Sequence, residues 1–243
     1  NLIYLMKNKL VLILLFVLPI ATYLIFSSAT HNSLFLPVLS KSNAEIPINW
    51  TSLDTSKIAL KGKITVLGFV GNNVIENRGN FFNLNQKIYN KYKGFTDFQM
   101  VMVTPKGNEA KAEQILSELE PITENMSGWK FVFADTTEIQ KYYDSYKLAG
   151  SLDENYGTPA VIIVDKDLNH RGRKGKNKKG DEEYKESYNT ISAADLHNEM
   201  TDDVKIMLRE YRLALKKNHN KRKDSFRDKI EENIENNKKS KNE

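Results

Sequence analysis

One long apolar run stands near the start of the chain. Residues 10–29 are almost entirely apolar or small. About 20 such residues, at ~1.5 Å rise each, span the ~30 Å hydrocarbon layer of a bilayer, and a proline such as Pro19 is tolerated in a lipid-embedded helix. We therefore expect a transmembrane helix that anchors the protein within residues 1–29.

The charges beside this run predict its orientation. Lys7 and Lys9 precede it, and no Lys or Arg follows before Lys41. The positive-inside rule then predicts a single-pass inner (cytoplasmic) membrane protein with a cytoplasmic N-terminus and a periplasmic soluble domain. A cleaved signal peptide is the alternative, because residues 27–29 are small, although the apolar stretch is long for such a signal.

Shorter apolar runs predict the strands of the soluble part. The nearly continuous run at 64–70 is typical of a strand buried on both faces. Similar patterns predict further strands, at 98–103, 129–133 and 157–165, with a short edge strand at 57–60 and a return strand near 168–171.

Helical spacing appears between these strands. Apolar residues recur every three or four positions in four segments, at 81–92, 112–119, 139–146 and 196–215. Strands that alternate with helices favour a sheet covered on both faces. The predicted fold class is α/β, with a central mixed sheet, helices on both faces and a C-terminal helical charged extension.

Composition divides the chain into parts. We expect an anchor (1–29), a Pro- and Ser-containing linker (30–56), a core domain (57–217) with a basic insertion at 171–190, and a charged helical or disordered tail (218–243). The net charge of +5 is uneven, because residues 216–243 contribute +4 and residues 171–186 contribute +3. The high pI therefore comes from local segments, and no nucleic-acid partner is expected.

The chain contains no cysteine. Disulfides, thiolate metal sites and cysteine nucleophiles are therefore excluded. The four histidines show no metal-binding spacing, and no serine, threonine or aspartate lies in a nucleophile or phosphate-loop motif. We expect no enzyme activity, no cofactor or metal, and no small-molecule substrate.

Two motifs resemble a known family. Leu67-Gly68-Phe69 closes the first buried strand, and Gly157-Thr158-Pro159 opens an apolar strand that ends at Asp165 before a turn. In these features, and in the order of its elements, the stretch 64–215 resembles membrane-anchored thioredoxin-like proteins of the TlpA/ResA and Sco/SenC kind. The resemblance implies a thioredoxin-like fold with a cis peptide bond before Pro159.

The same resemblance implies a dithiol that this chain lacks. TlpA-like cysteines correspond to Val74 and Asn77, and Sco-like cysteines to Asn72 and Glu76. The Sco-like copper histidine corresponds to the vicinity of Gly157. Without these soft ligands, the resemblance implies a domain without redox or copper-chaperone activity.

Two polar segments remain as candidate binding sites. The first is the former active-site loop with the proline, whose candidate residues are Asn72, Asn73, Glu76, Asn77, Arg78, Thr158 and Pro159. This loop binds an anion or an extended peptide, or it is a solvated loop whose asparagines cap the helix. The second is a basic surface loop that suits anionic lipid or an acidic partner, or is simply solvated: Arg171, Arg173, Lys174, Lys176, Lys178 and Lys179.

Together these patterns predict a non-enzymatic, membrane-anchored accessory subunit of a larger membrane protein complex, with the membrane contacted through residues 10–29. The alternative is a Sco-like or chaperone-like assembly factor that holds an extended client peptide, for example of a respiratory oxidase.

Overall fold

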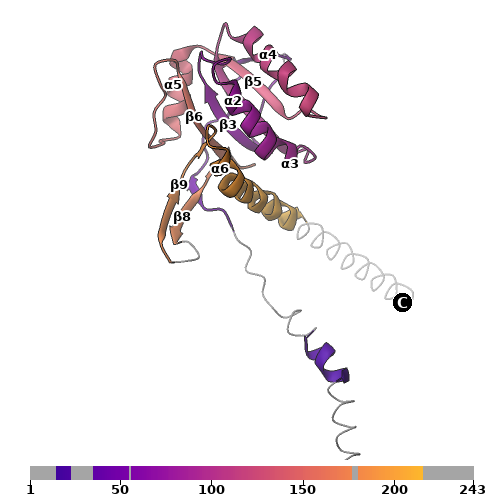
Figure 1. Cartoon of the computed structure of the whole chain (residues 1–243). Helices are drawn as coiled ribbons and strands as arrows, with labels where there is room; N and C mark the ends of the chain where they lie inside the picture. The colour runs from indigo at the N-terminus through magenta and orange to yellow at the C-terminus, as the bar shows by residue number, and fades with distance from the viewer. Residues whose placement is uncertain (1–14, 23–34, 55, 177–179, 216–243) are drawn as a thin grey trace, which may run out of the picture. The chain divides into compact units, whose positions relative to one another are not determined.

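The computed structural model describes residues 15–22, 35–54, 56–176 and 180–215 (Figure 1). The chain divides into two compact units, Asn1–Leu34 and Phe35–Glu243. In the first unit residues 15–22 are helical, and no helix within the described residues is long and apolar enough to cross a membrane. Most of the predicted anchor and the whole tail 218–243 lie outside the described residues.

The second unit is built on one mixed sheet. Its centre is β3 (Ile64–Val70), which pairs in parallel with β4 (Phe98–Pro105) and antiparallel with β6 (Gly157–Val164). β5 (Trp129–Ala134) continues the parallel part beside β4. The strand order is β1-β7-β6-β3-β4-β5-β2, and β10 also pairs with β6. The four long strands thus confirm the predicted strand segments.

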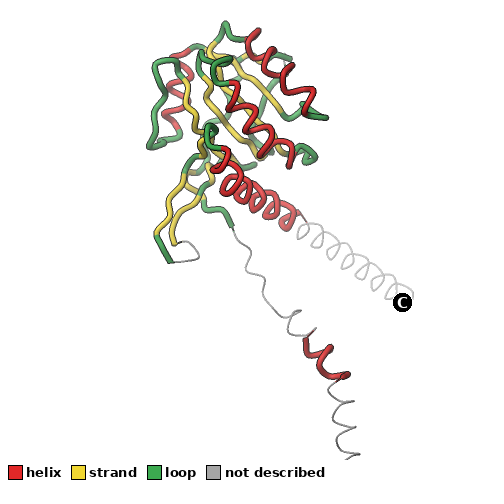
Figure 2. The backbone as a smooth tube through the Cα atoms, viewed as in Figure 1, coloured by secondary structure: helices red, strands yellow, loops and turns green. Residues whose placement is uncertain are grey.

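Short strands complete both sides of this sheet. They are β1 (Val38–Ser40), β2 (Thr51–Ser52), β7 (His170–Arg171) and β10 (Tyr188–Asn189). A separate hairpin is formed by β8 (Arg173–Lys176) and β9 (Glu182–Lys185), drawn in yellow apart from the main sheet (Figure 2).

The helices follow the predicted spacing. They are α2 (Arg78–Leu84), η1 (Asn85–Tyr89) and α3 (Asn90–Tyr92) in one continuous stretch, then α4 (Glu109–Leu119) with η2 (Glu120–Ile122), and α5 (Thr136–Ser145). The last stretch joins α6 (Ala193–Asp195), η3 (Leu196–Met200) and helical residues 201–215. The segments η1 and η3 are single π-helical turns inside longer helices, the form in which π-helices mostly occur.

Each face of the sheet carries its own apolar core. Side chains of α2, α4 and the last helix pack with Met100, Met102 and Phe131 on one face. On the other face, Phe69 and Val101 pack with residues of α5 and of the segment before β3. Figure 1 shows α2 and α4 on one side of the strands and α5 on the other. The predicted sheet with helices on both faces is confirmed.

Two sequence-based expectations about the segment before β3 were wrong. Residues 57–60 form no strand, and β1 and β2 arise instead inside the predicted linker 30–56. The reason is that isolated apolar side chains, Leu36 and Trp50, are buried against the sheet and anchor this polar segment. The Trp50 indole N–H also donates to a Glu138 carboxylate oxygen at 3.2 Å.

Candidate functional site

The loop that corresponds to the family's dithiol site connects β3 to α2. Its first residue, Gly71, has φ +71°, and a Cβ there would lie 2.5 Å from the Asn155 carbonyl oxygen. A Cβ on Gly157 would likewise lie 2.6 Å from the Val70 carbonyl oxygen. Glycine is needed at both positions because the ends of β3 and β6 meet backbone to backbone. The loop therefore starts from a tightly fixed point.

Polar contacts hold the first half of the loop in place. The Asn72 backbone N–H donates to the Asn155 carbonyl oxygen at 2.9 Å. The Asn108 side-chain amide donates to Asn72 Oδ1 at 3.0 Å, and the Lys111 ammonium donates to the Asn72 carbonyl oxygen at 3.2 Å. Val74 is fully buried. Asn72 thus acts as a structural anchor, and its amide oxygen is already engaged.

The second half of the loop is more exposed and forms no ligand cluster. Asn77 occupies the N-cap position of α2, but its side chain makes no capping hydrogen bond. Backbone turns satisfy the helix start instead, because the Arg78 N–H donates to the Ile75 carbonyl oxygen at 3.1 Å. The expectation that asparagine side chains cap this helix was wrong. Glu76 and Arg78 are exposed and form no ion pair within the described residues.

Pro159 does not have the expected geometry. No peptide bond among the described residues is cis, so the cis bond expected before Pro159 was wrong. β6 begins two residues earlier, at Gly157, and Pro159 lies within its extended run. A trans bond is the ordinary state of such a peptide. The Pro159 carbonyl oxygen pairs with a neighbouring segment.

That neighbouring segment belongs to the chain itself. β10 pairs antiparallel with β6 through Ala160 and Val161. Just beyond β10, Thr190 donates both its backbone N–H (2.9 Å) and its hydroxyl (2.7 Å) to the Pro159 carbonyl oxygen. The Asn83 amide on α2 then donates to the Thr190 carbonyl oxygen at 2.9 Å. Residues 188–191 therefore bridge from the proline strand to the first helix.

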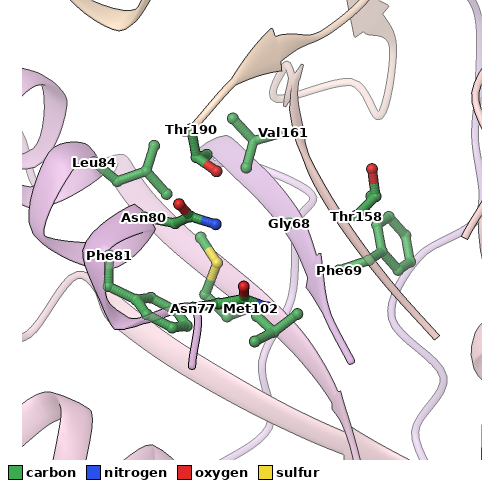
Figure 3. Close-up of a pocket in the computed structure, with 11 residues that line it drawn as sticks. Gly68, Phe69, Asn77, Asn80, Phe81, Leu84, Met102, Thr158, Val161 and Thr190 are labelled. Carbon is green, nitrogen blue, oxygen red and sulfur yellow. The ribbon is translucent and has the colours of Figure 1, made fainter. Parts of the chain in front are cut away.

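A small cavity of ≈30 Å³ remains between these elements. Figure 3 shows Asn80, Phe81 and Leu84 of α2 on the left, Thr190 and Val161 above, Met102 below, and Thr158 and Phe69 on the right. Such a volume holds one or two water molecules. Self-contacts therefore fill most of the space between the proline strand and the first helix, whereas Glu76 and Arg78 of the loop stay exposed.

The structure brings only part of the predicted site together. Asn77 and Thr158 line the cavity, whereas Asn72, Asn73, Glu76, Arg78 and Pro159 do not. Sequence reasoning missed Asn83 and Thr190, which close the site. Thr190 is the last residue of the predicted basic insertion 171–190, and no local pattern indicates that the chain returns to β6 there.

The predicted basic surface loop is only partly a surface. Arg171 is buried, and its guanidinium pairs with Asp165 at 2.9 Å and Glu210 at 2.6 Å. Arg173 pairs with Asp203 at 2.8 Å and Glu183 at 2.9 Å. The expectation that these two arginines are free surface charges was wrong, because both tie the insertion to the last helix.

The remaining basic residues divide between exposed and undescribed positions. Lys174 and Lys176 are exposed on β8, and Lys178 and Lys179 lie outside the described residues. Burial raises the pKa of Asp203. Its hydrogen bonds from the Arg173 guanidinium and the Tyr188 hydroxyl oppose that rise. The insertion is thus docked through ion pairs, and its exposed residues include Lys174, Lys176, Glu182 and Tyr184.

The residues at the former dithiol do not suit a soft metal ion. Within the described part of the chain, no three His, Cys, Asp or Glu side chains gather as possible ligands.

His170 is buried, and its Nε2 lies 2.6 Å from the Glu186 carbonyl oxygen. A carbonyl can only accept, so this nitrogen carries the proton. Burial lowers the pKa of His170, and the ring belongs to the β7 packing.

Comparison with known proteins agrees with this architecture. No protein-family model matches the chain, and no curated protein matches it. BsSco, a member of the Sco family of cytochrome c oxidase assembly proteins, superposes with a TM-score of 0.51 at 12% identity, over 72% of this chain and 98% of that one. A SCO1/SenC family lipoprotein from Bacillus anthracis gives 0.51 at 16% identity, over 72% and 99%.

The fold is thioredoxin-like. A putative protein disulfide isomerase from Bacteroides thetaiotaomicron is also similar, with a TM-score of 0.47 at 12% identity, over 72% of this chain and 95% of that one. The two Sco-type structures confirm the resemblance expected from the sequence as a resemblance of fold, in a chain that has no cysteine to supply the dithiol.

Proposed function

We propose that this protein is a non-enzymatic, membrane-anchored accessory subunit of a larger membrane protein complex, with a thioredoxin-like domain that performs no thiol chemistry. The observation that carries the proposal is the state of the former active site. It has no thiol, and residues 188–191 of the same chain close it. A thioredoxin-like domain kept in this form would hold neighbouring subunits of the complex in place.

The proposed anchor is residues 10–29, with the N-terminus in the cytoplasm and the domain in the periplasm. Support comes from the apolar run and from the lysines that precede it. Partners are other subunits of the complex. The lysine-bearing hairpin β8–β9 is a contact surface available to them, since Lys174 and Lys176 are exposed.

A Sco-like assembly factor that holds an extended client peptide is the second candidate. The likeness to BsSco favours it, because that protein is described as a member of a family of cytochrome c oxidase assembly proteins. The pairing of β10 with β6 opposes it, since an added client strand would compete with residues 188–190 for the Pro159 carbonyl oxygen. Client binding would require that segment to leave.

Gentle purification from native membranes tests the first proposal. We expect the protein to copurify in fixed proportion with other membrane subunits and to migrate well above its own 27.9 kDa. Recovery of a monomer alone would contradict it.

Photo-crosslinkers at position 76 and position 174 separate the two candidates. Both Glu76 and Lys174 are exposed, the first in the former active-site loop and the second on the hairpin. Crosslinks from position 174 to a membrane subunit support the accessory role. Crosslinks from position 76 to an extended peptide of a client would favour the assembly factor.

A further inference from the structure

A second cavity in the described part of the domain lies at the end of the sheet opposite to the former dithiol site. It has a volume of ≈440 Å³. Three segments form it, namely the residues before β3 (56–63), the turn before β4 (93–99) and the turn before β5 (125–130). These are the amino ends of three parallel strands. A volume of several hundred cubic ångströms is typical of small-molecule sites.

Lysines dominate the charge of this cavity. Five line it, whereas none of the residues that line it is an aspartate or glutamate: Lys57, Lys61, Lys63, Lys93 and Lys130. Two of them pair with carboxylates outside the lining, Lys93 with Glu124 and Lys130 with Asp54, each at 3.1 Å. Such solvent-exposed pairs are weak, so an entering anion can compete for both ammonium groups.

The other lysines are better placed for a ligand. The Lys63 ammonium donates to the Thr96 carbonyl oxygen at 2.8 Å. Lys57 and Lys61 are exposed, and their ammonium groups make no hydrogen bond or ion pair within the described residues. Lys57 and Lys61 therefore bring two unpaired positive charges to the cavity, and such charges attract a multivalent anion.

The cavity also offers neutral donors and an apolar wall. The Ser127 hydroxyl and the Asn125 side-chain amide donate no hydrogen bond within the described residues. Phe95 lines the cavity, and 38% of its surface is exposed. An exposed aromatic ring beside lysines suits a ligand that joins a flat or apolar body to charged oxygens.

We propose that this cavity binds a small organic phosphate, with the phosphate groups among Lys57, Lys61 and Lys63 and the organic body against Phe95. Lysine ammonium groups bind phosphate as point charges from several directions. The site is independent of the proposed membrane role. It differs from the expectation of no small-molecule substrate. The sequence did not indicate it because its lysines lie in three separate segments that only the fold brings together.

Calorimetry on the full chain in nanodiscs of zwitterionic lipid tests the proposal. The probes are ADP, which carries an aromatic body, and inorganic pyrophosphate, which does not. We expect both to bind, and Lys57→Gln with Lys61→Gln to weaken both by about tenfold, because each contact to a charge contributes several-fold in affinity. Phe95→Ala weakens ADP only.

The control is Lys174→Gln with Lys176→Gln, which removes two exposed lysines from β8. It should leave both affinities within about twofold. Nanodiscs that contain phosphatidylglycerol distinguish the source of the phosphate. If the lipid competes with ADP, the ligand is a lipid headgroup; if it does not compete, the ligand is soluble. Either result supports the site. Failure of both probes to bind, or an equal loss in the control, would overturn it.

Discussion

The two ends of the central sheet differ in how the chain uses them. At the carboxyl end of β3, glycines, asparagines and the segment 188–191 fill the space and leave a cavity of ≈30 Å³. At the amino end, an open cavity of ≈440 Å³ is lined by lysines. Open α/β sheets usually bind ligands at the carboxyl ends of their strands. In this protein the cavity at that end is much the smaller of the two, so the proposed binding site lies at the opposite end from the one that the fold relationship indicates.

The largest expected effect comes from a glycine at the closed end. Gly71→Ala places a Cβ 2.5 Å from the Asn155 carbonyl oxygen in a residue with φ +71°. Steric overlap and backbone strain together should lower the free energy of unfolding by about 3 kcal/mol. Chemical denaturation measures this loss of unfolding free energy.

Gly62→Ala is the matched control at the open end. Gly62 has φ +82°, but nothing lies within 4 Å of its added Cβ. Only backbone strain remains, so the loss should be about 1 kcal/mol. Equal losses at both positions would show that the closed end is not tightly packed.

The wall of the open cavity depends on one buried tyrosine. The Tyr89 hydroxyl donates to the Asn125 carbonyl oxygen at 2.8 Å and accepts from the Gly128 N–H at 2.9 Å. Tyr89→Phe leaves that N–H without a partner and should cost about 1–2 kcal/mol in unfolding free energy. Thermal unfolding checks the loss, and Tyr184→Phe on the exposed hairpin should be nearly neutral.

A smaller effect is expected from the bridge at the closed end. Asn83→Ala removes the hydrogen bond to the Thr190 carbonyl oxygen and should cost about 1 kcal/mol. Hydrogen exchange should speed up at residues 188–191 and stay unchanged at 125–128. Unchanged exchange at 188–191 would mean that Asn83 does not hold the bridge.

The smallest effect concerns pH. Burial lowers the pKa of His170 below its usual 6.5, so the folded state disfavours the protonated ring. The free energy of unfolding should then be fully retained above pH 6.5 and fall as the pH drops from there towards the folded-state pKa. His170→Gln, which keeps an N–H donor for the Glu186 carbonyl oxygen, should flatten that decline; an equally steep decline would assign it to other groups.

Sequence patterns predicted the long strands and the helices better than the short strands β1 and β2. Long buried strands such as 64–70 and helices with regular apolar spacing are local signals, and the structure confirms them. β1 and β2 were missed because single buried residues, Leu36 and Trp50, carry their packing. Such anchors leave no periodicity to detect.

The contacts around the candidate site could not be predicted from the sequence. Asn77 and Thr158 do line the small cavity, yet Thr190 closes it from more than 30 residues away. Arg171 was assigned to the surface because its segment is basic, whereas it is buried and pairs with nearby Asp165 and with Glu210 of the last helix. In both cases contacts formed only in the folded protein determine where the side chain lies, and a single sequence does not show those contacts.

The cysteine-free chain allows a direct test of the difference between the two ends. A single thiol is introduced as Val74→Cys, at a fully buried position of the closed end, or as Ser127→Cys, at an exposed position of the open cavity. We expect the thiol at 127 to react with a soluble labelling reagent at the rate of a free thiol. The thiol at 74 should react at least about 100-fold more slowly, because it must wait for local opening. Labelling of the two positions at rates within about tenfold of each other would contradict a closed former active site.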